Sequence, residues 1–377
     1  MSTREGELVI KGFATARGTS AYCARHVPPA ERAHFRSWDG LEISSVGIGT
    51  YLGSEDAGTD RAYRDAIARA LELGLNVVDS AVNYRHQKSE RVIGAALRTL
   101  IDGGQLARDE VVIATKGGFI PFDGSVPVDH DAYVTETYVR PGILEPKDLV
   151  GKCHCVTPRY LADQLERSRR NLDVETIDIY YVHNPERQLA EVDRPTFLGR
   201  MRAAFQFLEE AVGDGKIRRY GTATWNAYRQ QPSDREFLSL PDLARLASEV
   251  AGSGHHFRVI QLPYNLGLTE AFTRANQVMG DEAVSLLEAA RRLDMYVMTS
   301  ASLHQGQLAR NLPPIIGEFL PGLATDAQRA LQFVRSTPGV GTALVGMKQR
   351  GHVEENARLT AVAPLAWEQF KTLFSEG

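Results

Sequence analysis

DRAYRDAIARALELGLNVVD, residues 60–79, combines an amphipathic segment, a glycine and a short apolar run that ends in aspartate. From Ala66 to Leu73, apolar residues recur at spacings of three and four, which predicts the buried face of a helix. Gly74 can end that helix, because glycine adopts the left-handed conformation of a helix C-terminus without strain. The run Asn76–Asp79 then predicts a strand. This stretch is therefore one helix and one strand of an alternating α/β chain.

The same alternation continues along the chain from residue 43 onward. Strands are predicted at Ser45–Ile48, Asn76–Asp79, Val111–Thr115, Ile177–Val182, Arg219–Thr222, Arg258–Leu262, Met295–Thr299 and Thr342–Gly346. Helices are predicted at about 60–74, 89–101, 158–172, 198–213, 240–252, 281–293, 324–336 and 351–360. Eight apolar strands need cover on both faces, which eight alternating helices provide by closing into a (β/α)8 TIM barrel. The element count leaves a doubly wound open sheet as the alternative.

Composition and charge exclude several classes of protein. Of the 377 residues, 43% are hydrophobic and 24% are charged, which is typical of a soluble globular chain rather than of a collagen, a coiled coil or a disordered protein. The formal net charge of −4 supplies no positive field for nucleic acid or for an anionic membrane surface. We therefore expect a small-molecule partner, with no nucleic acid and no membrane.

Cysteine content and the start of the chain predict a cytoplasmic location. Three cysteines, Cys23, Cys153 and Cys155, are too few for a disulfide framework in a chain of this length. The opening MSTREGELVIKG lacks the apolar core of a secretory signal, and no run approaches the ~20 apolar residues of a membrane span. Cys153-His154-Cys155 lacks the second ligand pair of a structural zinc site, so we expect no metal.

The length beyond a plain barrel of about 250 residues falls in three segments. Residues 1–40 show no sustained periodicity and predict an irregular N-terminal leader, after which residues 41–377 form the barrel. A long loop at 117–157 follows the third strand, where the loops of a barrel surround the active site, and it is a candidate for substrate specificity. Apolar residues in 363–377 predict a C-terminal amphipathic helix.

Four polar residues stand where a barrel exposes reactive groups, at the carboxyl ends of its strands or just after them. Asp79 ends NVVD, Lys116 ends VVIATK and His183 ends DIYYVH, while Tyr84 follows Asp79 by five residues. An acid and an amine at neighbouring strand ends can approach closely, and the opposite charge keeps the buried lysine protonated. We expect the ammonium to lower the pKa of Tyr84 from about 10 and to make the phenol a general acid. The residues thus predict proton transfer to a developing oxyanion.

Each of these residues also has another explanation when it is considered alone. Asp79 can cap a helix, His183 can be a satisfied interior histidine, and Tyr84 can pack on the barrel rim. Lys116 can form a Schiff base, which would make the chain a barrel isomerase or lyase that uses no nicotinamide. Only the combination of the four residues favours proton transfer.

Eight motifs in a fixed order carry a resemblance to a known family. They are GIGTY at 47–51, NVVDSAVNY at 76–84, SERVIGAAL at 89–97, VVIATK at 111–116, LERSRRNLDVETIDIYYVHNPE at 165–186, GKIRRYGTATWN at 215–226, VIQLPYN at 259–265 and TPGVGTALVGMK at 337–348. With these motifs the sequence resembles the aldo-keto reductase superfamily, in its bacterial NADP-dependent form, over about residues 43–360. The leader has no counterpart in the usual family pattern.

The resemblance implies a catalytic tetrad of Asp79, Tyr84, Lys116 and His183, with no member missing. It implies reversible NADPH-dependent reduction of an aldehyde or ketone, in which Tyr84 donates the proton. Lys116, paired with Asp79, would lower the pKa of Tyr84, and His183 would orient and polarise the carbonyl.

The resemblance also implies a set of cofactor-binding residues. These are Thr50, Tyr51, Asp79, Thr224, Gln261, Thr299, Ser300, Met347, Lys348, Gln349, His352, Glu355 and Asn356. Lys348 would meet the 2′-phosphate as a point charge, which favours NADPH over NADH. Ala223-Thr224 stands where the family usually has Ser-Asn to hold the carboxamide. This departure supports a second hypothesis, a cofactor-binding regulatory or sensor subunit with little turnover.

Overall fold

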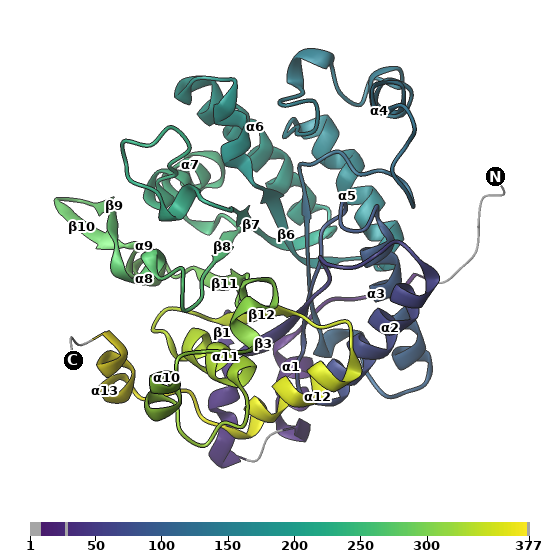
Figure 1. Ribbon diagram of the computed structural model, residues 1–377. Coiled ribbons are helices and arrows are strands. Elements are labelled where there is room, and N and C mark those ends of the chain that lie inside the picture. The colour runs from purple at the N-terminus through teal and green to yellow at the C-terminus, as the bar shows by residue number, and fades with distance from the viewer. Residues whose placement is uncertain (1–8, 27–28, 375–377) are drawn as a thin grey trace.

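The barrel is closed in the computed structural model, which describes residues 9–26 and 29–374. Its strands follow the order β11-β12-β3-β4-β5-β6-β7-β8, and β8 pairs with β11 to complete the ring (Figure 1). All pairings within the ring are parallel. The (β/α)8 barrel expected from the element count is confirmed, and the open-sheet alternative is wrong.

All eight predicted strands are present, with ends that move by no more than two residues. They are β3 (Val46–Gly49), β4 (Val77–Asp79), β5 (Val112–Gly117), β6 (Ile177–His183), β7 (Ile217–Ala223), β8 (Phe257–Pro263), β11 (Tyr296–Ser300) and β12 (Thr342–Gly346). The residues of β4, β5 and β6 are buried throughout, because helices cover the outside of the ring and side chains fill its inside.

The helices that surround the strands lie close to their predicted positions. They are α2 (Ala57–Glu72), α3 (Lys88–Asp102), α5 (Pro158–Leu172), α6 (Arg194–Gly213), α7 (Leu240–Ala251), α9 (Leu286–Arg292), α11 (Asp326–Ser336) and α12 (Arg350–Ala357). Shorter helices are α8 (Glu270–Thr273) and α10 (Pro314–Phe319). Among the described residues, no helix is long and apolar enough to cross a membrane.

The predicted helix at 281–293 is wrong in its first part. Glu282–Ser285 forms strand β10, which pairs antiparallel with β9 (Ala275–Met279) in a hairpin that projects at the left of Figure 1. The helix begins only at Leu286, because the Ser285 side chain accepts a hydrogen bond from the Glu288 amide and caps the first turn.

The expectation of an irregular leader over residues 1–40 is wrong for its described part. Residues Ala16–His26 form helix α1, and β1 (Phe35–Trp38) pairs with β2 (Leu41–Ser44) as a hairpin. Tyr22 is fully buried, and its hydroxyl donates to the Leu71 carbonyl of α2. Burial of such aromatic side chains stabilises an ordered segment that lacks sequence periodicity. Residues 1–8 and 27–28 lie outside the described residues.

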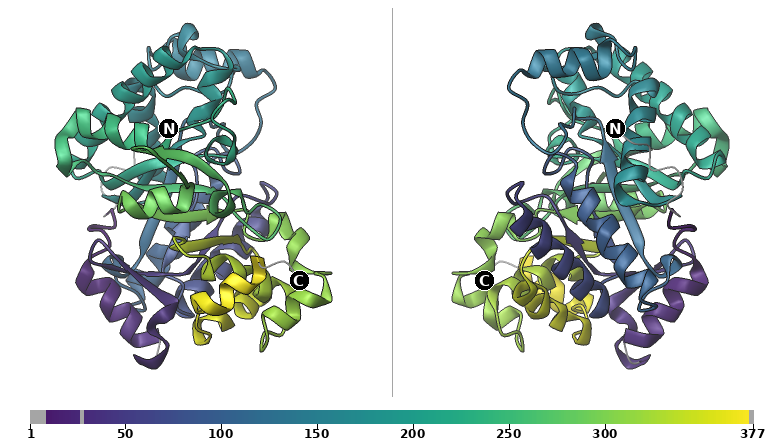
Figure 2. Two further views of the ribbon diagram at one scale, coloured as in Figure 1. Left: turned by 90° about the vertical axis from the view of Figure 1, so that its left-hand side faces the viewer. Right: turned by 90° about the vertical axis from the view of Figure 1, so that its right-hand side faces the viewer.

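The long loop at 117–157, here called the excursion, contains helical turns. Helix α4 (His130–Val134) continues into a π-helical turn at Thr135–Val139. The two ends of the excursion pair with each other, since the Ile120 amide donates to the Cys153 carbonyl over 2.7 Å. Its buried side chains form a cluster with Tyr160 of α5, separate from the barrel core, and the cluster is made of Ile120, Val134, Tyr138, Leu144, Cys155 and Tyr160. Both views of Figure 2 place this region and α1 at opposite ends of the molecule.

The end of the chain packs on the outside of the barrel. Helix α13 (Trp367–Phe370) is a single turn that continues into a 3₁₀ turn at Lys371–Phe374. Phe370 is fully buried, with its ring 5.6 Å from that of Phe272 and 5.7 Å from that of Phe333. The structure thus has a shorter terminal helix than predicted, and residues 375–377 lie outside its description.

Helices α3 and α5 are in close contact at Gly94. A β-carbon at Gly94 would lie 2.7 Å from the Asn171 carbonyl oxygen, so Gly94→Ala must push the two helices apart. We expect the free energy of unfolding to fall by roughly 1–3 kcal/mol in denaturant titrations. Gly199→Ala is the matched control, because Gly199 in α6 has open space around it and alanine favours a helix by ~1 kcal/mol. Equal effects of the two substitutions would contradict the close contact.

Candidate active site

A buried ion pair joins the carboxyl ends of two neighbouring barrel strands. Lys116 on β5 places its Nζ 2.6 Å from Oδ2 of Asp79 on β4 and also donates to the Ser80 carbonyl over 2.6 Å. The other carboxylate oxygen of Asp79 accepts a hydrogen bond of 2.8 Å from Nε2 of Gln261 on β8. Both side chains are almost fully inaccessible, at 1% for Lys116 and 6% for Asp79. The structure confirms the prediction that Asp79 and Lys116 lie close together.

Burial and the opposite charge act against each other on this pair. Burial raises the pKa of Asp79, and the Lys116 ammonium and the hydrogen bonds partly counter that shift. Burial likewise lowers the pKa of Lys116, and the Asp79 carboxylate, with a smaller contribution from Glu90, counters it. At 2.6 Å the attraction between the two groups offsets part of the free-energy cost of burying each of them.

Tyr84 lies over the ion pair, in the loop that follows β4. The Lys116 Nζ is 5.0 Å from the centre of the Tyr84 ring, and the ring of His183, at the end of β6, is 5.8 Å away in an edge-on orientation. The ring of Tyr51, which is 56% exposed, covers Tyr84 from the solvent side at 4.9 Å. The structure therefore brings together the four residues expected to be catalytic.

A left-handed turn presents Tyr84 to the barrel mouth. The three residues after it, Arg85, His86 and Gln87, have φ of 47°, 55° and 72° although none is glycine. Each such residue costs of the order of 1 kcal/mol, so neighbouring contacts must hold the turn. Arg85 forms an ion pair with Asp60, and Gln87 Nε2 donates to the Phe122 carbonyl of the excursion over 2.8 Å. Tyr84 is thus held by elements on both sides.

The expected lowering of the Tyr84 pKa is wrong for this structure. Burial, followed by the charges of Asp79 and Tyr51, raises the pKa of Tyr84 well above 10. The main physical reason is removal of the phenol from water, which disfavours its ionised form, and the negative charge of Asp79 adds to that effect. The phenol is therefore protonated at neutral pH and available as a proton donor.

His183 is neutral at the other side of Tyr84. Burial, with the nearby Lys116 charge, lowers the pKa of His183 well below 6.5. Its Nδ1 is buried and has no hydrogen-bond partner among residues 9–26 and 29–374. A neutral imidazole beside a protonated phenol can hydrogen-bond an oxygen that both groups face.

Residues expected to hold a nicotinamide ring lie at the same end of the barrel. Thr224, directly after β7, is buried, and its Oγ1 has no hydrogen-bond partner in the described part of the chain. Thr50 and Gln261 are also buried there, although the Gln261 amide nitrogen already donates to Asp79. Thr299 and Ser300 end β11. The unpartnered hydroxyl of Thr224 can donate to or accept from a polar group such as a carboxamide.

Residues expected to hold the adenosine end lie apart from the tetrad, beyond β12. Exposed Lys348 and Gln349 line a groove of about 370 Å³ between α2 and α12. Lys348 forms no ion pair with any described residue, so its ammonium is available to a phosphate. The remaining expected residues, Met347, His352, Glu355 and Asn356, follow on this end of β12 and on α12. Asn356 is buried against the Met347 sulfur at 3.4 Å.

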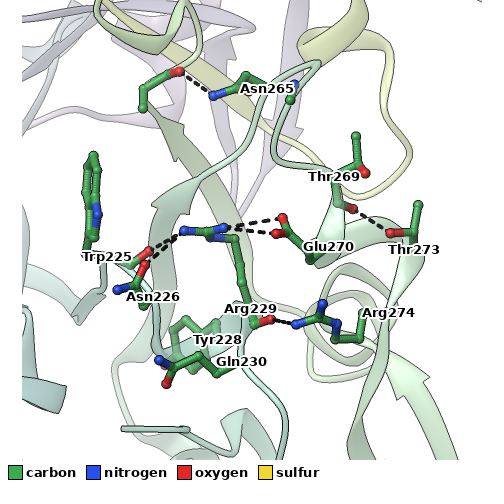
Figure 3. A network of polar contacts seen from close by, with 12 residues as sticks. Trp225, Asn226, Tyr228, Arg229, Gln230, Asn265, Thr269, Glu270, Thr273 and Arg274 are labelled. Carbon is green, nitrogen blue, oxygen red and sulfur yellow. Dashed lines mark hydrogen bonds and ion pairs between the residues drawn. The ribbon is translucent and has the colours of Figure 1, made fainter. Parts of the chain in front are cut away.

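A polar network fixes the loop that carries Thr224 and Trp225 (Figure 3). Arg229 donates to the Trp225 carbonyl over 3.1 Å and to the Asn226 side chain over 3.2 Å, and it pairs with Glu270 at 3.3 Å. Trp225 itself remains 46% exposed beside this network. The loop after β7 is therefore anchored to α8, which follows β8.

Glu186 is a functional candidate that sequence reasoning missed. It lies three residues after His183, is only 2% exposed, and accepts a hydrogen bond of 2.7 Å from the Trp225 amide. Burial raises the pKa of Glu186 to about 7. The Glu186 carboxyl thus joins the loops after β6 and β7, and no spacing in the sequence indicated this contact.

The match to a family model decides the relationship of this chain to known proteins. The model of the aldo/keto reductase family matches residues 45–240, more than half of the chain. The chain belongs to the aldo/keto reductase family. Membership confirms both the family and the oxidoreductase class expected from the sequence.

Similar proteins extend beyond the matched region of this aldo/keto reductase. A Schizosaccharomyces pombe protein named for a voltage-gated potassium channel subunit beta is 21% identical over 91% of each chain. An NADH-specific methylglyoxal reductase of Escherichia coli is 27% identical over 54% of each chain. The crystal structure of an aldo/keto reductase from Klebsiella pneumoniae, in complex with NADP and acetate, has a TM-score of 0.60 at 21% identity and covers 91% of this chain and 95% of its own.

The buried carboxyl of Glu186 predicts a pH-dependent stability. Its pKa is about 7 in the folded chain against 4.5 for an ordinary glutamate, so the folded state holds a proton that the unfolded state has lost between these values. Stability contributed by Glu186 therefore falls as the pH rises through this window. Relative to Glu186→Gln, the wild type should lose on the order of 1–3 kcal/mol of unfolding free energy between about pH 5 and about pH 8. A difference that does not change with pH would contradict the buried, protonated carboxyl.

Proposed function

We propose that this chain reduces an aldehyde or ketone with NADPH, using Tyr84 as the proton donor. The observation that carries the proposal is the arrangement around Tyr84, with Lys116 Nζ 5.0 Å from the ring centre and the His183 ring 5.8 Å away. A protonated phenol, a fixed cation and a neutral imidazole are the groups that a developing alkoxide needs.

The residues present fit a nicotinamide cofactor at the barrel mouth. Thr224, with its unpartnered buried hydroxyl, and Gln261 would hold the carboxamide, and Thr50 and Tyr51 would contact the adjoining ribose end. When bound, NADPH supplies hydride to the carbonyl carbon. The groove beside Lys348 would take the adenosine end, and its free ammonium supports NADPH over NADH.

The chain's own residues hold and move the proton. Tyr84 donates its hydroxyl proton to the carbonyl oxygen as negative charge develops there. The Lys116 ammonium then stabilises the phenolate that remains, and Asp79 keeps that ammonium in place through the 2.6 Å ion pair. His183 binds the same oxygen by a hydrogen bond, which orients the carbonyl toward Tyr84. No group has to reorganise its charge before the proton moves.

A regulatory subunit that binds the cofactor with little turnover is the second candidate. Two observations favour it, the pair Ala223-Thr224 in place of the usual Ser-Asn and the likeness to a protein named for a channel subunit beta. Tight NADPH binding without turnover of any carbonyl in a broad panel, together with a stable protein partner in pull-downs, would select this candidate. Turnover would reject it.

Tyr84→Phe tests the enzymatic candidate. A general acid contributes about 10²–10⁴ in rate, so NADPH oxidation with an aldehyde substrate should fall at least about 100-fold. NADPH affinity, measured by fluorescence quenching, should stay within about two-fold, because the aromatic ring is retained. Tyr133→Phe is the matched control, since the Tyr133 hydroxyl donates to Pro121 in the excursion, and it should leave the rate unchanged. Turnover by Tyr84→Phe within about three-fold of the wild type would exclude Tyr84 as the donor.

A further inference from the structure

The histidine of the Cys153-His154-Cys155 motif is in contact with the backbone of the proposed catalytic histidine. His154 Nε2 lies 2.7 Å from the carbonyl oxygen of His183. The imidazole is fully buried, at 0% exposure, and its Nδ1 lies 2.8 Å from Nε2 of Gln188. Gln188 in turn contacts Arg200 on α6 through its amide oxygen. Three side chains and one backbone carbonyl thus form one chain of hydrogen bonds.

The direction of every hydrogen bond in this chain follows from Arg200. A guanidinium can only donate, so the Gln188 oxygen accepts and its NH₂ group must face His154. The amide NH₂ can only donate as well, so His154 Nδ1 accepts and its Nε2–H donates to the His183 carbonyl. Burial lowers the pKa of His154 to about 4, which agrees with a neutral ring that has one donor and one acceptor.

The peptide bond after His183 is held on both sides. Its carbonyl accepts from His154, and its N–H, that of Asn184, donates to the Ala223 carbonyl of β7 over 2.6 Å. Asn184 has a left-handed φ of 44°, so the chain turns out of β6 at this point. Loss of either hydrogen bond would free the turn that sets the direction of the His183 side chain.

Side-chain packing supports the same contact. The ring of Phe119 meets His154 edge-on at 4.9 Å and His183 edge-on at 5.0 Å, and therefore lies between the two imidazoles. Gly118 has a φ of 150°, and a β-carbon there would come within 2.9 Å of the His183 oxygen and 3.0 Å of His154 Nε2. The absence of a side chain at Gly118 leaves the room that the hydrogen bond requires.

His154 is tied firmly to the excursion. Its amide donates to the Val150 carbonyl over 3.0 Å, and its carbonyl accepts from the Val150 amide over 2.8 Å. Cys155 beside it donates its amide to Gly118 over 2.9 Å and points into the buried cluster of the excursion. The position of His154 therefore depends on the folded excursion and not on the barrel alone.

We propose that His154 is a positioning residue, through which the excursion and Arg200 hold His183 in the orientation that the reaction needs. The proposal rests on the role given to His183 in the proposed function. It assigns a use to a motif that resembles half of a metal site, and it makes the excursion part of the catalytic apparatus rather than a substrate loop alone.

The kinetic test compares three variants with the wild type. His154→Leu removes the donor and should lower kcat about ten-fold or more with an aldehyde substrate, while the KM for NADPH stays within about two-fold. His154→Gln keeps an NH₂ donor at the same reach and should recover most of the loss. Cys155→Ala removes one sulfur atom next to His154 but none of the backbone hydrogen bonds that hold His154 in the excursion, so it should retain the wild-type rate. Equal losses in His154→Leu and Cys155→Ala would overturn the proposal.

A nuclear magnetic resonance measurement tests the relay whether or not the protein turns over a carbonyl. In the full-length ¹⁵N-labelled chain, His154 should show the neutral Nε2–H tautomer from about pH 5.5 to about pH 8. The His183 ring signals should shift in His154→Leu and stay in place in Cys155→Ala. An Nδ1–H tautomer, a His154 ring that titrates near pH 6.5, or His183 signals that do not respond to His154→Leu would each reject the relay. Absence of turnover in the wild type alongside the expected spectra would reject the proposed function and retain the relay.

Discussion

The buried ion pair between Asp79 and Lys116 is the constraint on which the rest of the site depends. Strand register sets its geometry, since Asp79 pairs with Ala114 and Lys116 stands two residues further along β5. Two ions taken out of water cost several kcal/mol each, and their attraction recovers this only with close contact and satisfied hydrogen bonds. Both conditions are met here. The two charged groups are 2.6 Å apart, Gln261 donates a hydrogen bond to Asp79, and Lys116 donates one to the Ser80 carbonyl. An apolar pair would fill a barrel core at a lower free-energy cost, and in the proposed function the two charges assist Tyr84 instead.

The loops around the ion pair position two further side chains next to it, Tyr84 and His183. The left-handed turn after Tyr84 is held by Asp60 on one side and by the excursion on the other. The peptide after His183 is held by His154 and by β7. The barrel thus provides the fixed charges, while the loops set the orientation of the two groups that are proposed to meet the substrate. The excursion contacts Gln87, three residues after Tyr84, and the carbonyl of His183, so it holds the segments that carry both groups.

The strands and the meeting of Asp79 with Lys116 could be predicted from the sequence because they depend on local signals. An apolar run that ends in a charged residue, as at Asp79 and Lys116, indicates a strand end and therefore a position at the barrel mouth. The helix predicted at 281–293 is wrong over Glu282–Ser285. The apolar spacing there suits a helix, but pairing with β9 decides the conformation. The His154 relay could not be predicted, since its members come from the excursion, the 3₁₀ turn Pro185–Ala190 and α6, and no spacing connects them. The raised pKa of Tyr84 depends on burial in the folded chain and on the nearby Asp79 and Tyr51, which the spacing of the sequence does not give.

Comparison of Lys116→Met, Asp79→Asn and the double variant distinguishes an ion pair that serves catalysis from one that is only structural. Each single change leaves one buried charge without its partner, so each should lower the free energy of unfolding by about 3–5 kcal/mol. The double variant should recover most of that loss. If the charges serve the chemistry, carbonyl reduction with NADPH should remain at least about 100-fold below the wild type in all three variants. A double variant that regains both its stability and its rate of reduction would show that the ion pair is structural, and would contradict the account.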